Sequence, residues 1–192
     1  MDENTLVFLI SDNGGAEYTH TTDNGRYEGG KNTEFEGGVK VPMIMRWTGN
    51  LPAGRRYDPI VSSLDIFPTA MRAAKAQMMP DRALDGVDLL PYVQDSITGY
   101  PHEHLYWKRG NSMVVRNNKW KLMINTYSGD TLLFNMAGNR YEDPDESSVN
   151  SDIVGQLTQA YSAWATTHKA PLWPPVIYYI GKKDGKEHYF EQ

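Results

Sequence analysis

The sequence predicts an α/β fold that continues into a small antiparallel sheet with one packed helix. An unbroken apolar run at residues 6–10 is typical of a buried strand in an α/β sheet. Short, turn-separated segments between residues 105 and 135 are typical of antiparallel hairpins. Apolar residues at helical spacing follow in residues 153–164. We therefore expect an α/β core over residues 1–103 and a small carboxy-terminal subdomain over residues 104–192.

The elements of the first half are predicted from apolar runs and turn residues. The first strand ends at Asn13-Gly14-Gly15, a turn-forming sequence. Residues 16–38 are polar and glycine-rich, and a loop of that length is usually functional or mobile. Residues 39–47 form the next predicted strand. A helix is expected to begin at an N-cap, Asp65.

The second half is predicted to be a sheet covered by a helix. The expected strands are residues 105–107, 112–116, 120–124 and 131–135. One apolar stripe is formed by Ile153, Leu157, Ala160, Tyr161 and Trp164. We expect this stripe to lie on the small sheet. No element is predicted from residue 171 onward.

Composition excludes several classes of function. At 192 residues the chain is long enough to bury a core. Its net charge of −5 argues against a nucleic-acid partner, because proteins that bind a phosphate backbone usually present a basic face. Cysteine is absent, which excludes disulfides, thiolate metal sites and cysteine-derived nucleophiles within these residues. No apolar stretch is long enough for a membrane-spanning helix.

A carboxylate and an amide follow the first predicted strand. Asp12 and Asn13 stand at its carboxyl end, where open α/β sheets bind their ligands. Both side chains offer the hard oxygen atoms that Ca²⁺ and Mg²⁺ prefer, and the glycines that follow allow a tight turn beneath an ion. The pair is a candidate metal site. Taken alone, a simple turn is the commoner explanation of such a tetrapeptide.

A lysine between two glycine pairs is the second candidate. Gly29-Gly30 precede Lys31 and Gly37-Gly38 follow it, so the chain can bring this lysine close to an anion. An ammonium with three donors suits a tetrahedral oxyanion. His20 lies in the loop between the metal pair and Lys31 and is a candidate substrate contact. The alternative explanation is a flexible surface loop with solvated charges.

The order of these motifs resembles a known family. The shared landmarks are Asp12-Asn13-Gly14, Gly30-Lys31-x-Thr33, Glu36-Gly37-Gly38-Val39-Lys40-Val41-Pro42, Arg46-Trp47-x-Gly49, Leu64-Asp65-Ile66-Phe67-Pro68-Thr69, Leu84-Asp85-Gly86-Val87-Asp88-Leu89, Val115-Arg116-x-x-Lys119-Trp120-Lys121-Leu122, Leu133-Phe134-Asn135 and Glu142-Asp143-Pro144-Asp145-Glu146. Together they resemble the second half of the sulfatase family, within the alkaline phosphatase superfamily, over most of residues 4–165.

This resemblance implies a fold, an activity and a set of roles. The fold is part of an alkaline-phosphatase-like sandwich, and the activity is arylsulfatase-like hydrolysis of a sulfated small molecule or glycan. Asp12 and Asn13 match two oxygen ligands to a divalent ion, usually Ca²⁺ and otherwise Mg²⁺. Lys31 matches a lysine that contacts the sulfate and offsets charge on the leaving oxygen. Lys40 departs from the family, which more often has arginine at this position.

The nucleophile of the family has no counterpart in this sequence. Sulfatases attack sulfur with a formylglycine made within a Cys/Ser-x-Pro/Ala-x-Arg motif, which does not occur in these 192 residues. In the family that motif lies upstream of the point where this chain begins. We therefore expect a carboxy-terminal portion, inactive alone, with the missing amino-terminal half as a possible partner. The alternatives are a phosphodiesterase or phosphonate hydrolase of the same superfamily, and a non-catalytic binding protein.

Overall fold

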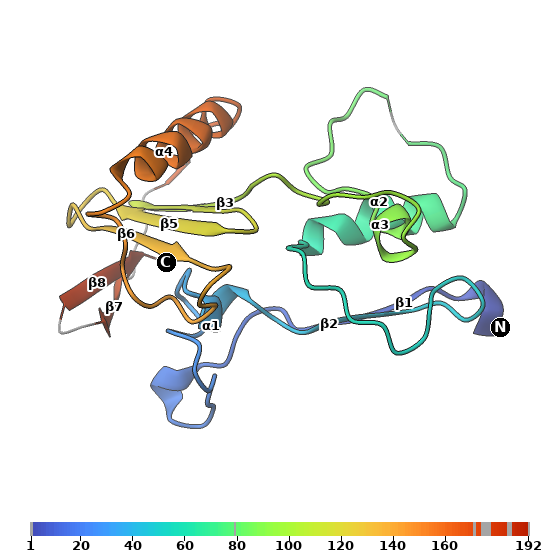
Figure 1. Cartoon of the computed structure of the whole chain (residues 1–192), viewed down its shortest axis with the longest axis horizontal. Helices are drawn as coiled ribbons and strands as arrows, with labels where there is room; N and C mark the ends of the chain where they lie inside the picture. Colours follow the sequence, from blue (N-terminus) through green and yellow to red (C-terminus); the bar gives the residue numbers. More distant parts are fainter. Residues whose placement is uncertain (1, 79, 171, 174–177, 184–185, 192) are drawn as a thin grey trace. The chain divides into compact units, whose positions relative to one another are not determined.

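The computed structural model describes residues 2–78, 80–170, 172–173, 178–183 and 186–191, and they form two compact units. The first unit contains Met1–Ser11 and Pro42–Glu103, and the second contains Asp12–Val41 and His104–Gln192 (Figure 1). The predicted boundary at residue 103 separates the same segments, except that residues 12–41 cluster with the second unit. The division into domains itself stays a prediction.

The first unit contains a two-stranded antiparallel ribbon. After the 3₁₀ helix η1 (Asp2–Asn4), strand β1 (Val7–Ile10) pairs with β2 (Met43–Arg46). Both predicted strands are thus confirmed, with shorter bounds. The burial predicted for this strand is wrong for the described residues, because Leu9 is 60% exposed. Alternation along the strand places Leu9 and its partner Ile44, also exposed, on the same face.

In the first unit, a serine cap begins the helical segment that leads into α2. The 3₁₀ helix η3 (Ser63–Asp65) leads into α2 (Ile66–Ala73), and α3 (Leu90–Val93) follows later. The predicted helix is confirmed and Asp65 stands at the N-cap position of α2, but its side chain makes no capping hydrogen bond there. The side chain of Ser62 accepts the backbone hydrogen bond from Leu64 at 3.2 Å, and Asp65 instead completes a capping box by accepting from the Ser62 N–H at 2.7 Å.

Asp65 is a buried anchor within the first unit. Its carboxylate also accepts a hydrogen bond from the Val87 N–H at 2.9 Å and lies 2.8 Å from His102 Nε2. Three segments distant in the sequence therefore meet at one fully buried side chain. Such a carboxylate is held in place by polar partners that replace its water.

The second unit is built on a four-stranded antiparallel sheet. Its strands are β3 (Leu105–Arg109), β4 (Ser112–Arg116), β5 (Trp120–Asn125) and β6 (Thr131–Asn135), and they lie in sequence order. Each is joined to the next by a short turn, as the glycine and asparagine signals between the segments predict. The predicted small antiparallel sheet is confirmed.

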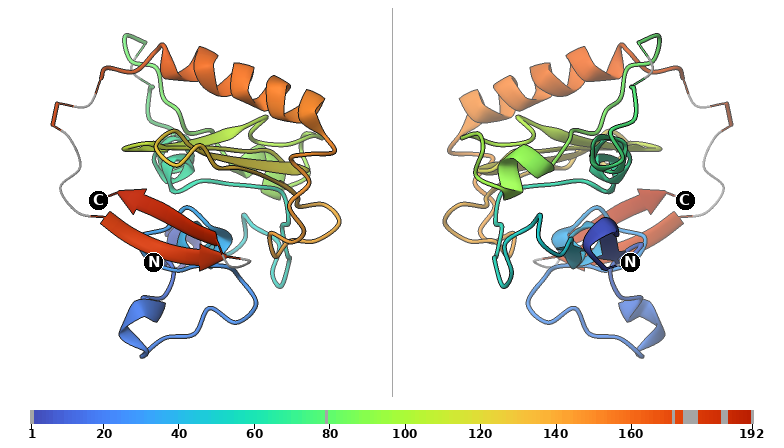
Figure 2. Two further views of the ribbon diagram at one scale, coloured as in Figure 1. Left: turned by 90° about the vertical axis from the view of Figure 1, so that its left-hand side faces the viewer. Right: turned by 90° about the vertical axis from the view of Figure 1, so that its right-hand side faces the viewer.

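Each face of this sheet is covered by a different part of the chain. Helix α4 (Ser151–Ala165) lies across one face, as both views of Figure 2 show. Its buried Leu157 and Tyr161 pack on a cluster that includes Leu122, so the predicted apolar stripe is confirmed. On the other face Phe35 packs on the cluster of Val114, Met123, Phe134 and Met136. The segment that carries Lys31 is therefore part of the core of this unit.

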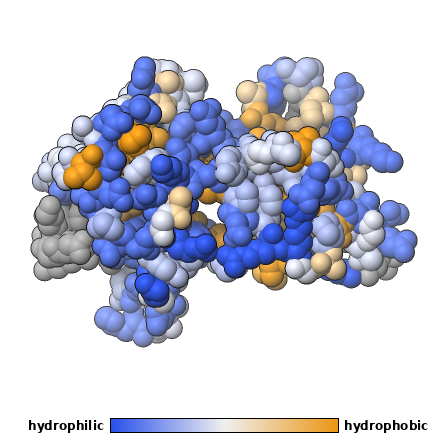
Figure 3. Space-filling view, viewed as in Figure 1, coloured by the Kyte–Doolittle hydropathy of each residue, from blue (hydrophilic) through white to orange (hydrophobic). Residues whose placement is uncertain are grey.

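Short elements complete the second unit. The 3₁₀ helix η2 (Glu17–Thr19) and helix α1 (Glu36–Val39) interrupt the predicted loop, and β7 (Tyr178–Lys183) pairs antiparallel with β8 (Lys186–Glu191). This last ribbon was not predicted, although Asp184-Gly185 in the sequence is a hairpin signal. Within the described part of the chain, every helix is too short or too polar to span a bilayer. The face drawn in Figure 3 is mostly hydrophilic, with hydrophobic residues in small separate groups.

Candidate functional site

The loops that carry the predicted site residues meet backbone to backbone. The Lys31 N–H donates to the carbonyl of Gly15 at 2.9 Å, and the Gly14 N–H donates to the carbonyl of Gly38 at 2.9 Å. The residues that follow Asp12 and Asn13 therefore lie beside both the beginning and the end of the segment from Lys31 to Gly38. The second unit brings the metal-pair loop and the lysine loop together in space.

Asn24 joins these two loops through its side chain. Its Nδ2 donates to the carbonyls of Gly15 at 3.1 Å and Gly29 at 3.0 Å, while its Oδ1 accepts from the Gly15 N–H at 2.9 Å. Its own backbone N–H donates to the Glu17 carboxylate at 3.0 Å. Asn24 was not among the predicted site residues, because one asparagine in a long polar loop carries no periodic or spacing signal.

The glycines of these loops are required by close backbone packing. A Cβ atom at Gly14 would lie 1.6 Å from the carbonyl oxygen of Gly37, and one at Gly30 would lie 2.3 Å from the carbonyl oxygen of Gly15. Real side chains do not tolerate such distances, so only glycine allows the loops to approach this closely. The glycine pairs around Lys31 thus have a packing role besides the steric freedom that the sequence suggested.

The predicted site side chains lie at the surface of the second unit. Asp12, His20 and Lys31 are exposed, and Asn13 is half-buried. Asp12 Oδ1 accepts the Asn13 N–H at 2.9 Å, and Asn13 Nδ2 donates to the Gly14 carbonyl at 2.8 Å. His20 ends helix η2 with a left-handed φ of 57°. The carboxylate of Asp12 and the ammonium of Lys31 are therefore accessible to a ligand from solvent.

Asp12 and Asn13 offer the type of oxygen ligand that a hard divalent ion prefers, but too few of them. Carboxylate and amide oxygens suit Ca²⁺ or Mg²⁺, but Ca²⁺ takes six to eight oxygen ligands. Among the described residues there is no group of three or more His, Cys, Asp or Glu side chains that could hold a metal ion. The two residues could thus form only part of such a site, and alone they would bind an ion weakly.

A group of buried charges lies beneath the lysine loop. We call Glu36, Arg116, Lys121 and Glu142 the buried charge cluster. Lys121 Nζ, which is fully buried, lies 3.0 Å from Glu36 Oε1 and 2.8 Å from Glu142 Oε1. Arg116 Nε lies 3.7 Å from Glu36 Oε1, and the Glu36 N–H donates to Glu142 Oε2 at 2.9 Å. Two cations and two carboxylates therefore share one water-poor space.

The pKa shifts of Lys121 and Glu36 favour the charged form of both side chains. Burial by itself disfavours a charged lysine, but the carboxylates of Glu142 and Glu36 outweigh it and raise the pKa of Lys121. Burial likewise opposes ionisation of Glu36, yet Lys121 and Arg116 lower its pKa below the ordinary value. Burial, supported by the nearby Glu36 charge, raises the pKa of Glu142. Glu36 is therefore the carboxylate of the cluster whose ionised form is favoured, while Glu142 makes the larger favourable charge interaction with Lys121.

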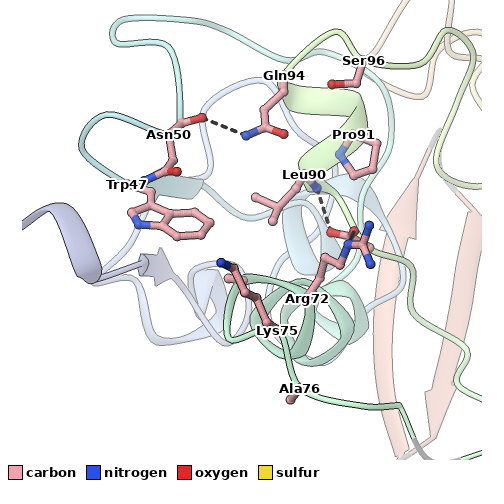
Figure 4. A pocket seen from close by; sticks show the side chains of 11 residues that line it. Trp47, Asn50, Arg72, Lys75, Ala76, Leu90, Pro91, Gln94 and Ser96 are labelled. Carbon is pink, nitrogen blue, oxygen red and sulfur yellow. Dashed lines mark hydrogen bonds and ion pairs between the residues drawn. The ribbon is translucent and has the colours of Figure 1, made fainter.

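The first unit contains a pocket of its own, with a volume of about 630 Å³. It is lined by Trp47, Asn50, Arg72, Ala73, Lys75, Ala76, Asp88, Leu90, Pro91, Gln94 and Ser96. Figure 4 shows the Trp47 ring and the Lys75 side chain facing this space, with Gln94 hydrogen-bonded to the Asn50 carbonyl at 2.9 Å. None of the predicted site residues lines this pocket. Its lining comes from several distant segments, which no local pattern in the sequence could join.

Comparisons with known proteins agree on one family. A family model described as Sulfatase matches residues 1–76. Human steryl-sulfatase is 37% identical over 186 residues, which cover 88% of this chain and 29% of that protein. The uncharacterized sulfatase YdeN of Escherichia coli (strain K12) is 41% identical over 105 residues, which cover 55% of this chain and 19% of that protein.

Solved structures have the same fold. The crystal structure of Ps i-CgsB matches with a TM-score of 0.79 at 28% identity, covering 90% of this chain and 39% of that one. The same match is found for Ps i-CgsB in complex with k-i-k-neocarrahexaose. The chain spans well under half the length of these matched proteins.

Proposed function

Because the chain belongs to the sulfatase family, we propose that it supplies the carboxy-terminal portion of a sulfuric ester hydrolase. Its mixed helix and sheet structure, with antiparallel sheets, matches sulfatases of the alkaline-phosphatase-like fold. The observation that carries the proposal is the paired hydrogen bonding of the two loops, Lys31 to Gly15 and Gly14 to Gly38. This pairing supports a single anion site with Asp12 and Asn13 on one side and Lys31 on the other.

Lys31 is proposed to act directly on the sulfate ester. Its exposed ammonium offers up to three hydrogen bonds to the sulfate oxygens and to the oxygen that leaves with the alcohol. As the sulfur–oxygen bond breaks, negative charge grows on that leaving oxygen, and a fixed positive charge stabilises it. Asp12 and Asn13 would hold a Ca²⁺ or Mg²⁺ ion, which when bound would polarise the sulfate oxygens. His20 is retained as a proposed substrate contact.

The remaining catalytic groups are proposed to lie outside these 192 residues. The sequence contains no Cys/Ser-x-Pro/Ala-x-Arg motif, so it offers no site for a formylglycine nucleophile. Two metal ligands are also too few. A positioned lysine does not replace a missing nucleophile, and we therefore propose that the chain is inactive by itself.

The proposed substrate is a sulfated small molecule or a glycan. Ps i-CgsB has been crystallised with k-i-k-neocarrahexaose, so a structure with this fold accommodates an oligosaccharide. The Lys31 side chain is exposed, so a bulky group next to the sulfate can reach it from solvent. This accessibility supports a glycan over a substrate that must be fully enclosed.

Turnover of 4-nitrophenyl sulfate tests the proposal. We expect none from the 192-residue chain and clear turnover from the product of the complete reading frame that contains it. In that product Lys31→Ala should lower kcat/KM by about 10²- to 10³-fold, because it removes charge stabilisation from the transition state. Lys119→Ala, at an exposed lysine of the β4–β5 turn, is the matched control and should change kcat/KM less than about threefold.

Four outcomes would count against the proposal. Turnover by the 192-residue chain that disappears in Lys31→Ala would show that it needs no further nucleophile. Equal activities of Lys31→Ala and Lys119→Ala would remove the role of Lys31. Faster turnover of a 4-nitrophenyl phosphodiester than of the sulfate would favour the phosphodiesterase alternative, and an upstream sequence without the nucleophile motif would favour a non-catalytic protein.

A further inference from the structure

The residues that follow Lys31 are anchored on the four-stranded sheet by polar contacts from three of them. The carbonyl of Asn32 accepts a hydrogen bond from the Arg109 guanidinium, and Glu34 Oε1 lies 2.9 Å from Arg109 Nε. Glu36 then reaches Lys121 in β5 at 3.0 Å. These contacts come from a turn-rich segment, in which Asn32 has a left-handed φ of 76° and Phe35 packs on the same sheet face between Glu34 and Glu36.

The turn that begins at Glu36 contacts both loops of the candidate site. In helix α1 the Gly37 N–H donates to the Glu28 carbonyl at 2.8 Å, which lies just before the glycine pair of the lysine loop. The Gly38 carbonyl accepts from the Gly14 N–H at 2.9 Å, next to Asn13. A displacement of Glu36 would therefore be passed to the metal-pair loop and the lysine loop together.

Lys121 is the residue that fixes Glu36 from below. It is fully buried and held on its other side by Glu142, whose Oε2 also accepts the backbone N–H of Glu36. Buried charges are costly to desolvate, and an apolar residue of similar size often stabilises a core equally well. What an ion pair adds is a single permitted geometry, because each charge must remain opposite its partner.

We propose that Lys121 is a positioning residue for the sulfate site. Its ammonium, braced by Glu142, holds Glu36 and thereby sets the relative position of the Lys31 loop and the Asp12–Asn13 loop. The identity of the positioned site rests on the proposed function, whereas the positioning itself is a property of the 192-residue chain. Lys121 would touch no substrate and would act on the site only through Glu36.

Amide hydrogen exchange, followed residue by residue by NMR, tests the positioning without any need for turnover. In Lys121→Met we expect the Gly14 and Lys31 amides to exchange about 10- to 100-fold faster, because their hydrogen bonds depend on the turn at Glu36. Amides in the middle of α4, on the opposite face of the sheet, should accelerate by less than about threefold. Lys119→Met is the matched control and should leave both sets unchanged.

A second variant guards against simple unfolding. Lys121→Met combined with Glu142→Gln removes one positive and one negative charge and leaves Glu36 paired with Arg116. It should fold with intact α4 amides and still show fast exchange at Gly14 and Lys31. The proposal is overturned if exchange accelerates equally at all amides or if neither variant folds, because Lys121 would then stabilise the fold as a whole. It is also overturned if exchange at Gly14 and Lys31 is unchanged, because Lys121 would then have no effect on the site.

Activity of the complete enzyme separates this proposal from the proposed function. Lys121→Met should lower kcat by about tenfold or more with a smaller change in KM, and Lys121→Arg should restore part of the loss because it keeps the charge. Fast exchange at Gly14 and Lys31 in an enzyme that does not need Lys31 would uphold the positioning and overturn the function. Unchanged slow exchange at Gly14 and Lys31 in Lys121→Met, in an enzyme whose activity depends on Lys31, would uphold the function and overturn the positioning.

Discussion

Replacement of Lys121 by methionine is expected to lower the free energy of unfolding by about 3–5 kcal/mol, the usual cost of removing one partner from a buried ion pair. Methionine fills most of the volume but leaves two buried carboxylates, Glu36 and Glu142, with Arg116 as the remaining cation of the cluster. Urea unfolding followed by circular dichroism measures the loss. Lys119→Met should change the free energy of unfolding by no more than about 0.5 kcal/mol.

The difference in free energy of unfolding between the wild-type chain and Lys121→Met should depend on pH, which provides an internal check. The pKa of Lys121 is raised in the folded protein, so its contribution is complete below the ordinary lysine pKa of about 10.4 and is lost as the pH rises through the folded value. The wild-type chain and Lys121→Met should therefore converge in stability at alkaline pH. A loss below about 1 kcal/mol at neutral pH, or a difference that does not shrink in alkali, would contradict a strongly coupled ion pair.

Among the glycines of the site, Gly14 is the one at which an added methyl group should destabilise the protein most. The added Cβ would lie 1.6 Å from the Gly37 carbonyl oxygen, and both groups belong to backbone that cannot rotate away. We expect a loss of about 2–3 kcal/mol and the rupture of the Gly14–Gly38 hydrogen bond, because overpacking at a rigid contact forces the chain apart. Urea unfolding and the exchange rate of the Gly14 amide measure the two effects.

Gly155 offers a matched control for this substitution. It lies within α4, and a Cβ atom there would meet nothing within 4 Å. Alanine has the higher helix propensity, so Gly155→Ala should raise the free energy of unfolding by about 0.5–1 kcal/mol. A Gly14→Ala chain as stable as the wild type would show that the two loops do not approach as closely as described.

The second unit was predicted well where its signals are local. Apolar alternation, turn residues between short segments and a helical stripe each act over a few residues, and these signals place β3 to β6 and α4 correctly. The strands β1 and β2 were both predicted from the same kind of signal, but their antiparallel pairing was not. An apolar run indicates a strand, and it does not indicate whether the neighbouring strand is parallel or what covers Leu9.

The supports of the candidate site could not be predicted, because they join distant residues. Lys121 alternates with Trp120 and Leu122, a pattern that normally places a lysine in solvent. It is buried instead, because the segment around Phe35 covers that face of the sheet. Glu36 and Lys121 stand 85 positions apart, and no periodicity connects them. The predicted roles of Asp12, Asn13 and Lys31 come from the family resemblance, that of His20 comes from its place in the loop, and all of them stay predictions.

Titration of the 192-residue chain with inorganic sulfate, followed by NMR, tests most directly whether Asp12, Asn13 and Lys31 serve one anion site. We expect the amide signals of Asn13 and Lys31 to move along a single saturable curve with one Kd, and Lys31→Ala to abolish both shifts while Lys119→Ala preserves them. Separate curves for the two amides, or shifts that survive Lys31→Ala unchanged, would contradict the shared site.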